Sequence, residues 1–309
     1  MSAPTVSVIL PTHNRAALLS AAMRSVLDQS YRDLELIVVD DASTDNTEAV
    51  VRAIGDPRVR YVRQPSNAGA AAARNRGIAE ARGEFVAFQD SDDEWLPGKL
   101  QMQVDRLSSL PKEFAITQGA VRSPGPPEQY FFTDLPSGAE PAAFMPVNNT
   151  SFSQAWLVRR AALLDVGPFD EHLSLWEDWE LILRLAQKYR IDMDPRAMAS
   201  ISDTPGSITK QAHRRVQCLR TIVSKHTALF ETEPKAMASN LYAIARFELL
   251  DDRAPAARPM LFRSLRYNPL LARAWVLLFM SLFGTNFVRR FFAWRNAPPK
   301  VSSAARSAQ

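Results

Sequence analysis

The strongest constraint on the fold of this chain is an alternation of short apolar strands and amphipathic helices near its N-terminus. Apolar runs typical of buried strands occupy Val6–Leu10, Leu34–Asp40, Val59–Val62 and Glu84–Gln89. Between them, apolar side chains recur at helical spacing. Alternation at this spacing predicts an α/β fold with a parallel sheet covered by helices.

Polar clusters directly follow three of these predicted strands. They read PTHNR at 11–15, DDASTD at 40–45 and DSDD at 90–93. Ligands of open α/β sheets bind at the carboxyl ends of the strands. The sequence therefore predicts a ligand site at this edge of the sheet.

The cluster Asp90-Ser91-Asp92-Asp93 places three carboxylates within four residues. Such groups repel one another unless a cation neutralises them, and Mg²⁺ is often shared between carboxylates and substrate phosphates. The alternative is an acidic helix N-terminus, which the helix dipole stabilises. Spacing alone leaves both interpretations open.

Two further polar segments have both a functional and a structural interpretation. Asp40 and Asp41 suit hydrogen bonds from a base or ribose, but they also suit a turn and helix cap. Asn67, Arg74 and Asn75 flank a glycine-containing helix start where a phosphate could bind. The chain contains no GxGxxG or Walker motif, which counts against dinucleotide-binding and P-loop folds.

A fourth polar segment, WEDWE at 176–180, places acids beside large aromatic side chains. A carboxylate partly desolvated against tryptophan can have a raised pKa and act as a general base. Tryptophan faces also suit stacking on a sugar ring. The alternative is an acidic helix start with tryptophans in the core, and the residues alone favour that alternative.

Taken together, these segments resemble the family 2 glycosyltransferases, which have the GT-A fold. The resemblance covers roughly residues 5–190 and includes one departure, Pro168, where the family often has glycine. It rests on VSVILPTHNR at 6–15, LDQSYRDLELIVVDDASTDNT at 27–47, NAGAAAARNRG at 67–77, GEFVAFQDSDD at 83–93, VGPFDE at 166–171 and WEDWELILRL at 176–185.

The resemblance implies an inverting transferase that uses a nucleotide-diphosphate sugar, with a UDP-sugar expected first, and Mn²⁺ or Mg²⁺. By position, Asp92 and Asp90 would hold the cation, and Asp178 would be the catalytic base with Glu177 beside it. On the acceptor side we expect Trp156, Trp176 and Trp179. The donor-binding positions are Pro11, Thr12, Asn14, Arg15, Asp40, Asp41, Asn67, Arg74, Asn75, Asp90 and Ser91.

The expected reaction transfers a sugar to a hydroxyl of a glycan or lipid-linked acceptor, in the synthesis of a cell-surface polysaccharide or glycolipid. A catalytically silent binding module and a nucleotidyltransferase remain alternatives. Residues 111–150 are rich in proline and glycine, which predicts loops and edge strands. The single cysteine, Cys218, suits a reducing compartment and hence the cytoplasm.

The C-terminal part reads as a helical extension over 216–296 that follows a catalytic domain over 1–215, with a disordered tail from Ala297. From Arg253 onward it carries ten basic and no acidic residues, whereas residues 1–252 carry 27 basic and 33 acidic residues. A basic, aromatic helix suits the inner surface of an anionic membrane, which we expect for 284–295. For 253–283 a packed subdomain is an equal alternative. Nucleic-acid binding fits poorly, because no binding module accompanies the charge.

Overall fold

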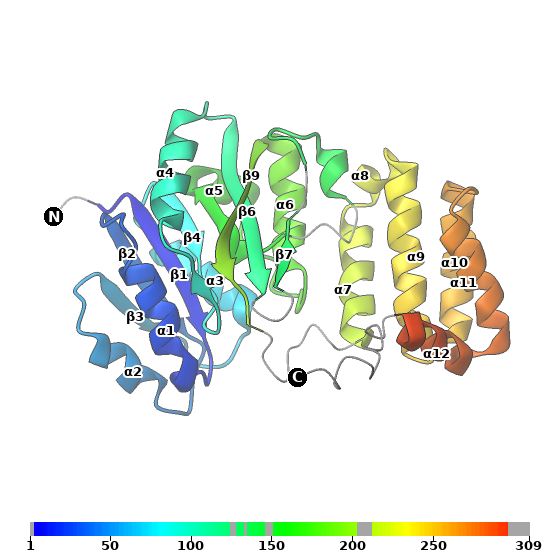
Figure 1. Ribbon diagram of the computed structural model, residues 1–309, viewed down its shortest axis with the longest axis horizontal. Helices are drawn as coiled ribbons and strands as arrows, with labels where there is room; N and C mark the ends of the chain where they lie inside the picture. Colours follow the sequence, from blue (N-terminus) through cyan, green and yellow to red (C-terminus); the bar gives the residue numbers. More distant parts are fainter. Residues whose placement is uncertain (1–2, 124–127, 133–134, 146–150, 203–211, 296–309) are drawn as a thin grey trace, which may run out of the picture. The chain divides into compact units, whose positions relative to one another are not determined.

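The computed structural model describes residues 3–123, 128–132, 135–145, 151–202 and 212–295 of the chain. The chain forms two compact units, Met1–Lys210 and Gln211–Gln309. The first unit contains a sheet covered by helices, and the described part of the second is helical (Figure 1). The predicted disordered tail lies outside the described residues.

Parallel strands form the N-terminal half of the sheet. β1 (Val6–Thr12) lies between β2 (Leu34–Asp40) and β4 (Phe85–Phe88), and β3 (Val59–Arg63) pairs with the far side of β2. All three pairings are parallel. This arrangement confirms the α/β prediction and brings the polar segments that follow β1, β2 and β4 to one edge.

The sheet continues with strands of mixed direction. Beyond β4 the order is β8, β6, β9 and β5, while β7 pairs with β6, which makes nine strands among the described residues. β8 is antiparallel to both β4 and β6, whereas β6 and β9 run parallel. These strands are β5 (Glu94–Trp95), β6 (Phe114–Ser123), β7 (Gln129–Phe131), β8 (Trp156–Arg159) and β9 (Arg190–Ser200).

The position of β6 corrects the prediction of loops and edge strands for 111–150. β6 is a central strand between β8 and β9, and its first eight residues are buried. Its glycine is a packing feature, because a Cβ on Gly119 would lie 2.0 Å from Cγ of Met198. The pairing with β9 shifts register at this point. Residues 124–127, 133–134 and 146–150 lie outside the described part.

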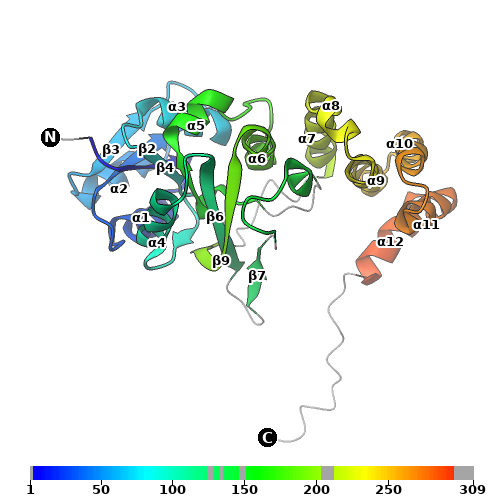
Figure 2. The same cartoon turned by 90° about the horizontal axis from the view of Figure 1, so that it is seen from above.

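Helices cover both faces of the sheet (Figure 2). α1 and α4 lie on one face, and α2 packs beside α1, while α3, α5 and α6 lie on the other face. Their bounds are α1 (Ala16–Leu27), α2 (Thr47–Ile54), α3 (Ala70–Glu80), α4 (Lys99–Ser109), α5 (Arg160–Val166) and α6 (Glu177–Lys188). Two short 3₁₀ helices, Pro141–Phe144 and Ser153–Ala155, complete the unit.

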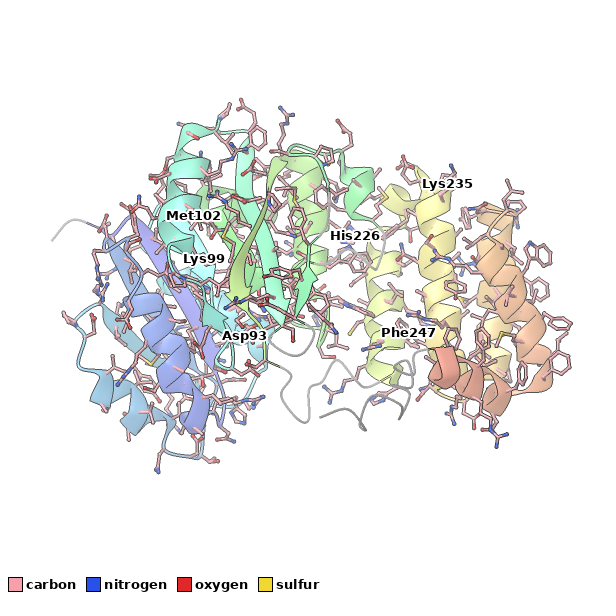
Figure 3. All side chains as sticks on the ribbon, in the orientation of Figure 1. Asp93, Lys99, Met102, His226, Lys235 and Phe247 are labelled. Carbon is pink, nitrogen blue, oxygen red and sulfur yellow. The ribbon has the colours of Figure 1, made fainter. Side chains whose placement is uncertain are left out.

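Two close contacts fix the helices on the sheet. On one face, α3 approaches β1 so closely that a Cβ on Gly77 would lie 2.3 Å from Cγ2 of Ile9. On the other face, the ammonium of the fully buried Lys99 lies 3.8 Å from the ring centre of Trp95 and donates to Oε1 of Gln103 at 2.7 Å (Figure 3). Burial lowers the pKa of Lys99 well below its usual value.

The second unit consists of packed helices, as predicted for the C-terminal part. Its apolar core includes Leu249, Leu261, Leu277, Val288 and Phe292. Its elements are α7 (Ala212–Lys225), α8 (Thr227–Glu231), α9 (Pro234–Leu250), α10 (Ala254–Tyr267), α11 (Ala272–Met280), η4 (Ser281–Phe283) and α12 (Thr285–Arg295). Across the ranges described above, none of the helices combines the length and the hydropathy that a bilayer span requires.

Because α3 and β1 are in close contact at Gly77, we expect a single added methyl group there to lower the stability of the protein. Gly77→Ala should lower the free energy of unfolding by about 1–3 kcal/mol, because the added carbon overlaps Ile9. Urea denaturation measures this loss. In an Ile9→Ala background the same substitution should cost less, because the overlapping side chain is absent. Equal costs in the two backgrounds would contradict the packing described here.

Candidate active site

Hydrogen bonds join the loops that follow β1 and β2 at the carboxyl edge of the sheet. The backbone N–H of Asn14 donates to Oγ of Ser43 at 2.9 Å, and Oδ1 of Asn14 accepts from the N–H of Thr44 at 2.8 Å. Asn14 and Ala42 have φ angles of 51° and 58°, which are uncommon for residues other than glycine. The two loops therefore form one preorganised surface rather than two separate turns.

Asp41 uses its carboxylate to fix the loop that leads into α3. Its oxygens accept hydrogen bonds from Nε2 of Gln64 at 2.7 Å, the N–H of Ala68 at 2.8 Å and the N–H of Gly69 at 2.7 Å. Gly69, the N-cap residue that precedes α3, has a φ of 93°, a conformation that glycine adopts without strain. Asp41 therefore sets the position of the segment that contains the exposed Asn67.

Asp40 is fully buried and holds the same edge of the sheet in place from the interior of the protein. It accepts hydrogen bonds from the N–H of Ser43 at 2.8 Å and from the hydroxyl of Tyr61, and it lies 3.5 Å from Arg63. Burial and the bond to Asp40 raise the pKa of Tyr61 to about 12. This burial corrects the expectation that Asp40 contacts a nucleoside, because its carboxylate has no exposed surface.

The centre of the site is Arg74, which projects from α3 between two acidic segments. Its guanidinium donates to Oδ1 of Asp90 at 2.7 Å and to Oε1 of Glu177 at 2.7 Å, and only 7% of its side chain is exposed. Burial disfavours the charged form, but the charges of Asp90 and Glu177 outweigh it and raise the pKa of Arg74. Arg74 therefore joins the residues after β4 to the start of α6.

Asn75, the next residue of α3, holds the segment at 166–171. Its Nδ2 donates to the carbonyl of Phe169 at 2.9 Å and to Oε1 of Glu171 at 2.8 Å, while its Oδ1 accepts from the N–H of Phe169 at 2.8 Å. The carbonyl of Pro168 accepts from Arg184 at 2.7 Å. The amide of Asn75 therefore positions this loop, and its contact with the donor stays a prediction.

The three carboxylates at 90–93 point in different directions. Asp93 is buried and accepts from the N–H of Ser202 and from Nε2 of Gln154, each at 2.8 Å (Figure 3). Burial raises the pKa of Asp93 to about 8, and the charges of Asp90 and Asp92 act in the same direction. Asp93 is therefore a structural residue, and the more exposed Asp90 and Asp92 are the candidates for ligand contact.

Asp90 and Asp92 suit a cation that shares its coordination with a substrate. Their side chains are 28% and 25% exposed, and Asp92 lies 3.7 Å from Arg15. In the described ranges, no cluster of three or more His, Cys, Asp or Glu side chains could hold an ion without help. Two carboxylates completed by phosphate oxygens form a donor set that suits Mg²⁺ or Mn²⁺.

Asp178 and Glu177 occupy the first turn of α6, directly after Trp176, which has a φ of 61°. Burial, together with the negative charge of Glu177, raises the pKa of Asp178 to about 8. Oδ1 of Asp178 accepts from the N–H of Trp179 at 2.7 Å. A carboxylate with a pKa near neutrality is suited to proton transfer.

Two of the three predicted acceptor tryptophans belong to the core, which corrects that prediction. Trp156 and Trp179 are 0% and 1% exposed, and their indole N–H groups donate to Oε1 of Gln118 at 3.1 Å and to the carbonyl of Phe144 at 2.7 Å. Neither ring face can stack on a sugar. Trp176 is partly exposed and packs edge-on against Trp179 with ring centres 6.5 Å apart.

The remaining predicted residues lie at the same edge with different exposures. Pro11, Thr12 and Ser91 are buried, and the Thr12 hydroxyl has no hydrogen-bond partner in the part of the chain that the structure describes. The sequence did not indicate Tyr61 or Gln64 as site residues. Their positions depend on how β3 pairs with β2, and no local motif marks them.

Comparisons with known proteins identify the family of the chain. The model of the family described as glycosyl transferase family 2 matches residues 7–167. A putative colanic acid biosynthesis glycosyl transferase, WcaA of Escherichia coli K12, is 32% identical over 197 residues, which are 60% of this chain and 67% of that relative. The UDP-Glc:α-D-GlcNAc-diphosphoundecaprenol β-1,3-glucosyltransferase WfgD of Escherichia coli is 43% identical over 102 residues. That match spans 33% of this chain and 40% of the relative.

Solved structures share the fold at low sequence identity. Staphylococcus aureus TarS 1–349 in complex with UDP-GlcNAc matches with a TM-score of 0.70 and 18% identity, over 94% of this chain and 91% of that one. The mannosyltransferase PcManGT of Pyrobaculum calidifontis, in complex with GDP-Man and Mn²⁺, matches with a TM-score of 0.59 and 20% identity. That match covers 96% of this chain and 89% of the other. At these identities the likeness supports the fold alone.

The double ion pair of Arg74 predicts a large loss of stability when it is removed. Arg74→Met should lower the free energy of unfolding by about 3–5 kcal/mol, because two partly buried carboxylates lose their partner. The matched control is Arg76→Met on the same helix, where the side chain is 53% exposed and pairs with Glu80. It should change stability by less than about 1 kcal/mol. Similar losses for both variants in urea denaturation would contradict the central role of Arg74.

Proposed function

The chain belongs to glycosyl transferase family 2, and from this premise we propose that it is an inverting transferase. It moves a sugar from a nucleotide-diphosphate sugar to a hydroxyl of its acceptor. The observation that carries the proposal is the bridge from Asp90 through Arg74 to Glu177. A reaction of this kind needs a donor end and an acceptor end at a fixed separation, and Arg74 ties the two acidic segments together.

At the donor end, the nucleotide would lie along the surface formed by the loops after β1 and β2. The buried Thr12 hydroxyl offers an unused hydrogen-bonding group there. The exposed Asn67 and the partly exposed Arg15 border the same surface. Asp40 and Asp41 act indirectly, because their carboxylates hold these loops in place.

Asp92 and Asp90 would hold a divalent cation, Mn²⁺ or Mg²⁺, together with the phosphates of the donor. When bound, such an ion stabilises the charge of the leaving diphosphate. Arg74 already neutralises part of Asp90, so Asp92 is the stronger ligand candidate. Arg15, at 3.7 Å from Asp92, would bring a second positive charge to the diphosphate.

At the acceptor end, Asp178 would remove the proton from the attacking hydroxyl. The oxygen attacks the anomeric carbon from the face opposite the diphosphate, so a single displacement inverts the configuration. The carbon–oxygen bond to the diphosphate breaks as the new glycosidic bond forms, and the proton ends on Asp178. Glu177 supports this step because it accepts from Arg74 and raises the pKa of its neighbour.

The named activities of the relatives and the charge of the chain support a proposal for the acceptor and the location. We propose a UDP-sugar as donor and a glycan or lipid-linked acceptor, in cell-surface polysaccharide or glycolipid synthesis. The catalytic domain would comprise residues 1–215. The helical extension over 216–296 would hold it at the cytoplasmic face of the membrane, where lipid-linked acceptors are available.

Removal of Asp92 should abolish metal-dependent donor binding. Calorimetry with UDP and Mn²⁺ should detect binding to the unaltered protein and none above the metal-free level for Asp92→Ala, because the ion loses a ligand. Asp165→Ala is the matched control, since Asp165 is exposed on α5 and pairs with Lys188. If Asp92→Ala keeps the metal-dependent affinity, Asp92 is not part of the site.

The two acids of α6 should differ in their effects on transfer. Asp178→Asn should lower kcat by about 10²–10⁴ with little change in donor binding, because it removes only the proton acceptor. In the unaltered protein, kcat/KM should rise with pH up to about 8, because the base acts in its ionised form. Glu177→Gln should retain activity and shift this rise to lower pH, because one negative charge beside Asp178 is gone.

Steady-state transfer assays between pH 5.5 and 9.5 measure both effects. Nearly unaltered activity of Asp178→Asn together with inactive Glu177→Gln would assign the base to Glu177. Full activity of both variants would place the base outside α6.

A further inference from the structure

The second unit exposes a group of large apolar side chains on consecutive elements. Each has about half or more of its surface open to solvent, and together they define what we call the aromatic surface. Its members are Trp275 (54%), Val276 (53%), Phe279 (61%), Leu282 (65%), Phe283 (60%) and Phe287 (49%). Single exposed apolar residues are ordinary, but contiguous groups mark interaction sites.

Ring contacts join the members across three elements. Phe279 of α11 lies 5.1 Å from Phe283 of η4, and Phe283 lies 5.7 Å from Phe287 of α12, measured between ring centres. These elements adjoin at the end of the helical unit (Figure 1). These three phenylalanine rings therefore form one continuous apolar strip, and Trp275 lies one helical turn before Phe279 on α11.

The strip lies in a strongly basic segment. The same helices carry the exposed Arg273, Arg289 and Arg290, and the chain has no Asp or Glu after Asp252. Arg273 donates to Oγ of Ser239 and Arg289 donates to the carbonyl of Leu250, so both side chains also contact α9. The last two acids before it already have partners, since Asp251 pairs with Arg253 at 2.6 Å and Asp252 accepts from Thr285. A partner that covers this strip must tolerate or neutralise concentrated positive charge.

The structure indicates a different segment for the membrane contact than the sequence does. The sequence favoured 284–295 as the membrane-binding helix, but Val288 and Phe292 of α12 are 0% and 7% exposed and belong to the core of the unit. α12 is therefore packed through that face. The open apolar surface is contributed mostly by α11 and η4, for which the sequence left a packed subdomain as an equal alternative.

We propose that the aromatic surface docks on the interface of a bilayer rich in anionic phospholipids. Its rings would enter the boundary between headgroups and acyl chains, and the flanking arginines would contact the lipid phosphates. A second copy of the chain is a poorer occupant, because self-association would bring two basic rims together. Docking needs neither a sugar donor nor an acceptor, so its failure would leave the proposed transfer reaction intact.

Vesicle flotation with the full chain tests this assignment. The protein should float with vesicles of phosphatidylglycerol and phosphatidylcholine at low salt, and much less with phosphatidylcholine alone or at high salt. Phe279→Ser combined with Phe283→Ser should weaken partitioning by roughly tenfold or more. Leu164→Ser is the matched control, because Leu164 is 56% exposed on α5 of the first unit. It should float like the unaltered protein.

Fluorescence quenching gives a second measurement, which needs only the unaltered protein and one conservative variant. Brominated lipids should quench the emission of the unaltered protein, and Trp275→Phe should remove most of that quenching, because Trp275 is the tryptophan of the strip. No flotation with anionic vesicles at low salt would overturn the proposal. So would a serine double variant that floats normally, or one that only converts a dimer of the chain to a monomer.

Discussion

The site depends on the ion pairs that Arg74 makes with Asp90 and Glu177. Both contacts measure 2.7 Å, and the guanidinium is almost entirely buried. A buried pair of this kind adds little net stability, because desolvation offsets the attraction, whereas removal of one partner is costly. The ion pairs instead fix the relative positions of two segments. It fixes the end of β4 against the start of α6, and thus the proposed donor side against the proposed acceptor side.

The aspartates around Arg74 form two groups that differ in burial and in role. Asp40, Asp41 and Asp93 direct their carboxylates into the protein, where backbone and side-chain donors satisfy them. Asp92 and Asp178 keep part of their surface open. The buried aspartates fix the loops, so the partly exposed aspartates can bind a ligand with little rearrangement. Preorganisation of this kind is how a site stabilises developing charge.

Much of this arrangement could be predicted from the sequence, because it is encoded locally. The alternating strands and helices and the acids at the strand ends gave the sheet and its functional edge. The role of β6 could not be predicted, because proline and glycine nearby resemble loop signals, and its burial depends on pairing with distant β8 and β9. Trp156 and Trp179 were misassigned for a related reason. Their neighbours in the sequence are compatible with a ring that faces either solvent or the core, and the burial of both rings depends on tertiary packing.

The anomeric configuration of the released sugar tests whether this site transfers sugar by a single inverting displacement. The full chain is incubated with Mn²⁺ and a panel of nucleotide sugars, and the products of slow hydrolysis are identified by NMR before the sugar mutarotates. We expect a free nucleoside diphosphate and a sugar released first in the anomeric configuration opposite to that of the donor. A sugar 1-phosphate, a retained configuration or no release from any donor would contradict it.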